Sequence, residues 1–246
     1  MRVHALWRHP VKSMQGERVE ELRITPRGVE HDRRYGVLDR ATGTILSAKR
    51  DGELLRARAL QTGPELVVCL PNGETVLGLG AGSDAALSSW LGRQVHLQEA
   101  TEHSAGTYEL HEDATDDDSP VHQWTGPEGS FVDSSPVHVL TTASLRAAQA
   151  DVRRFRPNVV VTSDDDGFVE DDWVGALLHV GEAVLQAAKR CTRCAMVTRA
   201  QPGGLERDLD VFRSLARDHD ASLGVLAWVV QPGVVRVGDA VRVERA

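Results

Sequence analysis

Residues 183–198 read Ala-Val-Leu-Gln-Ala-Ala-Lys-Arg-Cys-Thr-Arg-Cys-Ala-Met-Val-Thr, and this stretch decides the class of fold. Residues 183–188 have the period-2 pattern of a β-strand, and residues 195–198 are strand-like as well. Cys191 and Cys194 stand between these two segments. A redox Cys-x-x-Cys pair normally opens a helix in a βαβ unit. This context instead indicates a thiol-bearing turn within a β-rich fold.

The same period-2 pattern recurs along the chain, with turn residues between the segments. It predicts strands over residues 17–24, 34–39, 54–60, 65–70, 94–99, 137–141, 158–161, 183–188, 225–230 and 241–244. Many short strands with Gly- and Pro-containing turns favour barrels or sandwiches over a parallel α/β sheet.

Few segments have the pattern of a helix. Residues 83–92 are expected to begin at a Ser83-Asp84 cap and to end at Gly92. Two further helices are expected over residues 142–152 and 205–219, the second with an apolar stripe. The predicted fold class is therefore a β-rich α+β fold with a few helices.

Composition excludes several functional classes. The 246 residues include 28 Lys plus Arg and 36 Asp plus Glu, which gives a net charge of −8, and 41 % of them are hydrophobic. So many apolar residues can bury a sizeable core, while the acidic balance argues against nucleic-acid binding. No apolar run reaches the roughly 18 residues of a membrane span, and no signal peptide is visible. With three cysteines, we expect a cytoplasmic protein with no membrane association.

Residues 99–130 differ from the rest, because they are polar and poor in β-branched residues. They are interpreted as a linker or a long surface loop. The expected organisation is an N-terminal domain over residues 1–100, a linker over 101–124 and a C-terminal domain over 125–246. The Asp116–Asp118 and Asp164–Asp166 runs lack the Gly and terminal Glu of an EF-hand, so we expect solvated loops there.

The thiol pair admits several interpretations. Lys189, Arg190 and Arg193 surround Cys191 and Cys194, and positive charge favours thiolate over thiol. A zinc site normally needs four ligands, and the remaining thiol, Cys69, lies in an apolar run that is expected to be buried. A single thiolate on a soft metal needs one Cys and a basic surrounding. Two ordinary cysteines in a turn remain the alternative.

Three other motifs carry groups that bind anions or amide edges. Arg156 precedes Pro157, which biases it toward extended backbone, so that Arg156 and Asn158 would face the same side. Lys12-Ser13 followed by Gly16 offers an ammonium, a hydroxyl and backbone N–H groups. Consecutive hydroxyls at Ser134 and Ser135 suit an oxyanion. Each motif alone is equally compatible with a polar turn.

Taken together and in this order, the motifs resemble the MOSC superfamily, which includes the mitochondrial amidoxime-reducing component, its bacterial relatives and the C-terminal domain of molybdenum cofactor sulfurase. In the N-terminal half the resemblance lies in Leu6-Trp7, Pro10-Val11-Lys12-Ser13, Gly16, Gly28, Asp32-Arg33, Leu38-Asp39 and Gly43. In the C-terminal half it lies in Asp133-Ser134-Ser135-Pro136, Ala143-Ser144-Leu145, Arg154-Phe155-Arg156-Pro157-Asn158, Asp172-Trp173, Cys191-Thr192-Arg193-Cys194, Pro232-Gly233 and Val237-Gly238-Asp239.

The resemblance implies an N-terminal β-barrel-like domain followed by a MOSC β-barrel. It also implies the molybdenum cofactor, Mo-molybdopterin, with Cys194 as the metal ligand and catalytic centre. The residues implied to bind this cofactor are Lys12, Ser13, Arg33, Ser134, Ser135, Arg156, Asn158, Thr192, Arg193 and Cys194.

The implied activity is that of a molybdenum-dependent oxidoreductase that reduces small N-hydroxylated substrates. The sequence shows no iron–sulfur domain like that of some bacterial relatives, so separate electron-transfer proteins are expected to supply the electrons. It shows no aminotransferase-like domain either, which argues against a complete cofactor sulfurase. The alternative is a carrier of sulfur or of the cofactor that turns over no substrate.

The chain also departs from the family pattern. The family's acidic, Thr-rich stretch after the second Cys is replaced by residues 196–204, and its Phe-Gly by Leu223-Gly224. Leu226 stands where an aromatic residue is expected. These departures concern a substrate-side or cofactor-packing role in the implied site.

Overall fold

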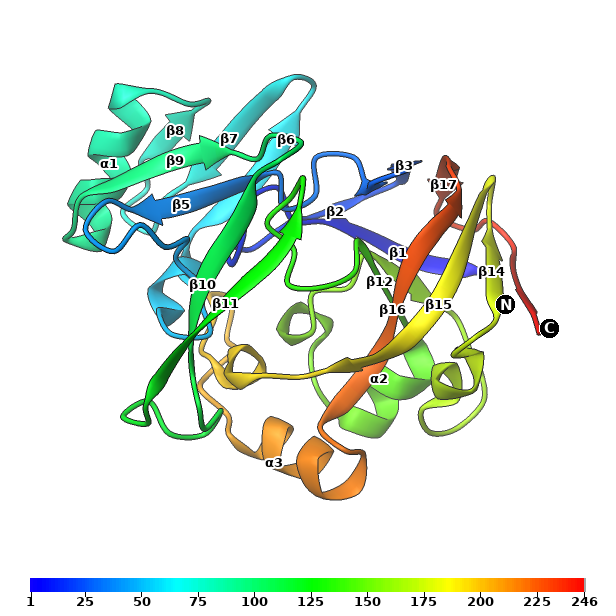
Figure 1. Cartoon of the computed structure of the whole chain (residues 1–246). Helices are drawn as coiled ribbons and strands as arrows, with labels where there is room; N and C mark the ends of the chain where they lie inside the picture. The colour runs from blue at the N-terminus through cyan, green and yellow to red at the C-terminus, as the bar shows by residue number, and fades with distance from the viewer. Residues whose placement is uncertain (246) are drawn as a thin grey trace.

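The structure is a computed structural model that describes residues 1–245, and it shows a β-rich chain folded into two lobes (Figure 1). Its α-helices are α1 Ala81–Leu91, α2 Thr142–Ala148 and α3 Asp210–Asp218. Its strands are β1 Val3–Arg8, β2 Glu17–Val19, β3 Glu21–Thr25, β4 Gly28–Val29, β5 Tyr35–Asp39, β6 Arg58–Thr62, β7 Glu65–Cys69, β8 Thr75–Leu77, β9 Val95–Glu99, β10 Ala105–His111, β11 Val121–Glu128, β12 Val137–Thr141, β13 Val159–Val161, β14 Leu177–Val180, β15 Ala183–Thr192, β16 Ser222–Gln231, β17 Gly233–Arg236 and β18 Val241–Glu244. The predicted β-rich class is confirmed.

One eight-stranded sheet joins the two ends of the chain. Its strand order is β18-β14-β15-β16-β12-β13-β1-β2, so the first two strands lie in the sheet of the C-terminal lobe. β1 pairs antiparallel with β13, with Leu6 opposite Val159. β17 pairs with β3 in the same way, with Val235 opposite Leu22. Their buried side chains share one hydrophobic core with those of β15 and β16.

The N-terminal lobe is barrel-like and has its own core. The β5–β9 pair and the β6-β7-β8 sheet surround the second hydrophobic cluster, with α1 packed beside β9 (Figure 1). Leu54, Leu87 and Leu97 are fully buried in it. Residues 54–60 were predicted as one strand, but residues Gly52–Arg56 form a 3-10 helix with an Asp51 cap, and β6 begins only at Arg58.

The segment that the sequence predicts as a linker or surface loop is instead an antiparallel β-hairpin, β10–β11. Tyr108 is fully buried on its inner face, and a Cβ added at Gly126 would lie 2.9 Å from the Tyr108 ring. The outer face is exposed to solvent and carries Val121 and Trp124 beside polar side chains. Because backbone pairing forms the hairpin with few apolar side chains, its composition is that of a loop.

Two helix ends also differ from the predictions. α1 begins at Ala81 after Gly80, while Ser83 and Asp84 lie within its first turn and bond to other segments. α2 ends at Ala148, because Gln149 has a left-handed φ of 47°. α3 covers only Asp210–Asp218 of the predicted residues 205–219.

The shared sheet predicts that Leu6→Ala destabilises the chain by about 2–5 kcal/mol, because Leu6 is fully buried between N- and C-terminal strands. Urea unfolding followed by circular dichroism measures this change. Leu77→Ala is the matched control, since Leu77 is 57 % exposed and its loss should change the free energy of unfolding by less than about 0.5 kcal/mol. Equal effects of the two substitutions would contradict the shared core.

Candidate functional site

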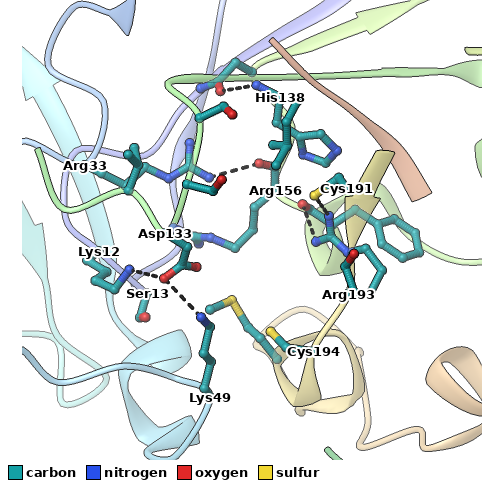
Figure 2. Close-up of a pocket in the computed structure, with 18 of the residues that line it drawn as sticks. Lys12, Ser13, Arg33, Lys49, Asp133, His138, Arg156, Cys191, Arg193 and Cys194 are labelled. Atoms are coloured by element: carbon teal, nitrogen blue, oxygen red, sulfur yellow. Dashed lines mark hydrogen bonds and ion pairs between the residues drawn. The ribbon is translucent and has the colours of Figure 1, made fainter. Parts of the chain in front are cut away.

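A cavity of about 260 Å³ lies between the lobes, and the thiol loop forms one of its walls (Figure 2). All ten residues that the resemblance implies line it, although they come from segments up to 182 positions apart. The N-terminal lobe contributes Lys12, Ser13 and Arg33. The C-terminal lobe contributes Ser134, Ser135, Arg156, Asn158, Thr192, Arg193 and Cys194. Their functional roles remain predictions.

The thiol loop is placed by irregular strand pairing. The β15–β16 ladder shifts register between Ala187 and Lys189 and again between Arg190 and Thr192. Such bulges bend a strand and redirect its side chains. Cys194 lies two residues after the end of β15 and directly before a 3-10 helix, Ala195–Thr198. The strand-like interpretation of residues 195–198 was therefore wrong.

The two thiols have different surroundings, and both are half-buried. Arg193 Nη1 donates to Cys191 Sγ at 2.8 Å, while Arg193 Nη2 donates to the Phe155 carbonyl at 2.9 Å. No described residue donates a hydrogen bond to Cys194 Sγ, which lies on the same loop as Cys191 but near Lys49 (Figure 2). Of the two sulfur atoms, only that of Cys191 accepts a hydrogen bond from a side chain within residues 1–245.

Three cavity residues have left-handed backbone, which non-glycine residues rarely adopt. The φ values are 66° for Ser13, 46° for Arg33 and 55° for Arg156. The extended conformation expected for Arg156 is therefore wrong. The Arg156 N–H donates to Val152 O at 3.2 Å, and Arg33 Nη2 donates to Arg156 O at 3.1 Å. These bonds turn the chain at Arg156 and carry its guanidinium into the cavity.

Lys12 and Lys49 share one carboxylate, that of Asp133. Lys12 Nζ lies 2.8 Å and Lys49 Nζ 3.1 Å from Asp133 Oδ1 (Figure 2). Burial lowers the pKa of Lys12 to about 8, against the opposing effect of Asp133. Burial alone would raise the pKa of Asp133, but the two ammonium groups outweigh it and keep that pKa well below its usual range. Asp133 thus stays ionised and offsets part of the positive charge.

Arg156 has no such partner. Its Nη1 donates to the Met14 carbonyl, while its buried Nη2 has no hydrogen-bond partner among residues 1–245. Burial and the nearby Arg33 lower the pKa of Arg156 to about 9, so the guanidinium is still charged at neutral pH. The buried Oγ of Ser135 also lacks a partner in the described chain. The cavity therefore presents donors suited to an anion.

The donor set fits the molybdenum cofactor on chemical grounds. A free thiol suits a soft metal, while buried cations and hydroxyls suit a phosphate and the polar edge of a fused heterocycle. The cavity wall carries cations from both lobes, and Asp133 is its acidic residue. These cations are Lys12, Arg33, Lys49, Arg156, Lys189, Arg190 and Arg193.

Sequence reasoning missed Lys49, Asp133 and His138 as cavity residues. Asp133 stands beside the predicted Ser134, and Lys49 lies outside the motifs that carry the resemblance. His138 is one of ten histidines without metal-type spacing. Only the fold brings these three side chains to the cavity.

Three features of the chain outside this cavity bear on function, namely metal-ligating clusters, the third thiol and the length of the helices. Within residues 1–245, no cluster of three or more His, Cys, Asp or Glu side chains is placed to hold a metal ion. Cys69, expected in the core, is only half-buried. No helix in that part of the chain is long and apolar enough to cross a membrane.

The fold and the site define a two-lobed β-barrel protein with a thiol at a cation-lined cavity. Residues 1–125 match the MOSC N-terminal beta barrel domain, and residues 126–242 match the MOSC domain. The chain therefore belongs to the MOSC family, which is associated with molybdenum cofactor binding or sulfuration, and the resemblance seen in the sequence is confirmed.

Individual relatives are more distant. The chain is 24 % identical over 251 residues to a molybdenum cofactor sulfurase from Solanum lycopersicum, covering 85 % of this chain and 30 % of that protein. The crystal structure of the YuaD protein from Bacillus subtilis matches with a TM-score of 0.45 and 11 % identity, over 100 % of this chain and 96 % of that one. YiiM from Geobacillus stearothermophilus matches with a TM-score of 0.35 and 16 % identity, over 50 % of this chain and 66 % of that one.

The buried His138 makes the free energy of unfolding depend on pH. Burial and the nearby Arg193 lower its pKa to about 3, and its Nε2 lies 3.3 Å from the Leu223 carbonyl. The unfolded chain, with a His pKa of about 6.5, binds a proton that the folded chain does not. The contribution of His138 to stability is therefore fully present above about pH 6.5 and is lost progressively as the pH is lowered toward 3.

We expect His138→Gln to reduce this slope by up to about 1.4 kcal/mol per pH unit between pH 5 and 6. Urea unfolding at several pH values measures the slope. His9, whose pKa burial also lowers, remains in the variant and should leave a residual slope of the same sign. An unchanged slope in His138→Gln would show that His138 is charged in the folded protein.

Proposed function

We propose that this chain binds the molybdenum cofactor in the cavity between its lobes and reduces small N-hydroxylated substrates. One observation carries the proposal: the half-buried thiol of Cys194 faces a cavity that also contains the unpartnered, charged Nη2 of Arg156. A soft thiol ligand and a cation without an ion-pair partner in one cavity suit a ligand that has both a soft metal and an anionic group.

Cys194 would ligate the metal. Lys12, Arg33 and Arg156 would pair with the phosphate of the cofactor. Backbone and hydroxyl groups at the remaining positions would orient the pterin, and these positions are Ser13, Ser134, Ser135, Asn158, Thr192 and Arg193. The orientation of the Asn158 side chain is fixed by two hydrogen bonds: its Oδ1 accepts from the His138 N–H, and its Nδ2 donates to the Trp7 carbonyl.

The reaction would break an N–O bond: R–NH–OH takes up two electrons and two protons and yields R–NH₂ and H₂O. When bound, the cofactor supplies the two-electron oxygen-transfer chemistry. Separate electron-transfer proteins would supply the electrons. Lys12 Nζ, with its pKa of about 8, would hold a proton at neutral pH. The three cysteines are unpaired, which suits a reducing compartment such as the cytoplasm.

A carrier of sulfur or of the cofactor is the second candidate, favoured by the similarity to part of a molybdenum cofactor sulfurase. The two functions differ in turnover. A carrier would bind the cofactor but would not reduce benzamidoxime with an artificial electron donor, whereas a reductase would.

Cys194→Ser should abolish molybdenum retention in protein made in a cofactor-competent host, because a hydroxyl is a poor ligand for a soft metal. Elemental analysis and pterin fluorescence measure retention. Cys191→Ser is the matched control and should reduce molybdenum retention less, since the Cys191 sulfur already accepts a hydrogen bond from Arg193. Equal losses would overturn the ranking of the thiols, and wild-type protein without molybdenum and pterin would overturn the proposal.

Arg156→Lys should weaken cofactor retention by about tenfold or more, because lysine keeps the charge but loses the planar fork of donors. The pterin that remains after gel filtration measures retention. Arg153→Lys is the control, since Arg153 pairs with Asp151 outside the cavity. Equal retention in the two variants would contradict the role assigned to Arg156.

A further inference from the structure

The tip of the β10–β11 hairpin is tied to the C-terminal lobe by one carboxylate. Asp117 Oδ2 accepts a hydrogen bond from Arg199 Nη1 at 2.7 Å, and its Oδ1 lies 2.6 Å from Arg199 Nη2. Arg207 Nη2 lies 3.0 Å from Asp117 Oδ2. A bidentate pair of this kind fixes both orientation and distance. The acidic run that the sequence suggested as a solvated loop thus has one member engaged with two arginines.

Arg199 joins three segments of the chain. It follows the short helix that begins after Cys194, and its side chain is largely buried. Besides Asp117, its Nη2 donates to the Lys49 carbonyl at 3.1 Å. Its Cδ lies 3.3 Å from the position that a Cβ on Gly52 would take, so the packing leaves little room. One guanidinium therefore connects the hairpin, the Lys49 loop and the thiol loop.

The hairpin also supports the opposite wall of the cavity. The Tyr108 ring lies 3.8 Å from Lys12 Nζ, and Trp124 Nε1 donates to the Asp133 carbonyl at 3.2 Å. Lys12 and Asp133 are joined to Lys49 by the ion pairs described above. A displacement of the hairpin would reach these three residues together. In Figure 1 the hairpin crosses from the N-terminal lobe toward α3.

We propose that Arg199 is a positioning residue. Together with Asp117 it latches the hairpin, so that the cavity wall containing Lys49 stays close to the wall containing Cys194. The latch limits how far the cavity opens and hence how fast a bound ligand is exchanged. That the ligand is the molybdenum cofactor rests on the proposed function; the latch itself does not.

The test compares Asp117→Asn with Asp118→Asn. Each substitution removes one negative charge at the exposed hairpin tip, but Asp118 forms no ion pair within residues 1–245. The full chain without cofactor is treated with iodoacetamide or with a bulky maleimide, and mass spectrometry follows the modification of Cys194. The ratio of the maleimide rate to the iodoacetamide rate reports how accessible the thiol is, because thiolate reactivity affects both rates. Cys69, in the N-terminal lobe, is the internal reference.

Asp117→Asn should raise this ratio at Cys194 by about three- to tenfold, as expected for a partly exposed, charge-assisted pair. Asp118→Asn should leave the ratio unchanged, and Cys69 should respond to neither substitution. High salt should move the wild-type ratio toward that of Asp117→Asn. An unchanged ratio in Asp117→Asn, or an equal rise in both variants, would overturn the latch.

The second measurement uses holoprotein. Pterin should be released faster from Asp117→Asn than from wild type or Asp118→Asn, and equal release rates would overturn the role of the latch in exchange. If the wild type binds no pterin, the proposed function fails, while the thiol ratios still decide whether the latch exists.

Discussion

The antiparallel pairing of β1 with β13 is the constraint on which the site depends. It sets Leu6 opposite Val159, and Trp7 N donates to Asn158 O at 2.9 Å. Because the strands run in opposite directions, the residues after β1 and those before β13 emerge at the same end of the sheet. Lys12 and Arg156 therefore face one cavity, although 144 positions separate them in the chain.

The cavity concentrates positive charge in a chain whose net charge is −8. Several of its cations donate to backbone carbonyls: Lys12 to Phe131, Arg156 to Met14 and Arg193 to Phe155. A carbonyl satisfies a donor but neutralises no charge. Asp133 and Asp32 pair with Lys12, Lys49 and Arg33, whereas Arg156 forms no ion pair within residues 1–245. The repulsion that remains opposes folding and favours binding of an anion, a trade commonly found at functional sites.

The sequence predicted those strands whose buried faces are apolar and alternate along the chain, but it missed others, among them β1, β10, β11, β14 and β17. In β15, Ala183, Leu185 and Ala187 are buried while their neighbours are half-exposed, which is the pattern that marked it. The cavity residues were reached differently, through a resemblance, since no local pattern links Lys12 to Cys194. Neither the strand patterns nor the resemblance identified Lys49 and His138, because only tertiary packing places them at the cavity. The left-handed turn at Arg156 depends on bonds to Val152 and Arg33, which the local preference before proline does not include.

The β10–β11 hairpin shows why a polar segment can be mistaken for a linker. Apart from the buried Tyr108, its tip is tied to the chain by contacts between distant positions: the ion pair of Asp117 with Arg199, 82 residues away, and the hydrogen bond from Arg199 to the Lys49 carbonyl, 150 residues away. Such pairs leave no periodic pattern in a sequence. They also differ from an apolar core in how they open, since separated charges regain water while separated apolar surfaces do not. A polar tie is therefore the kind of contact that can join two walls of a cavity and still release them.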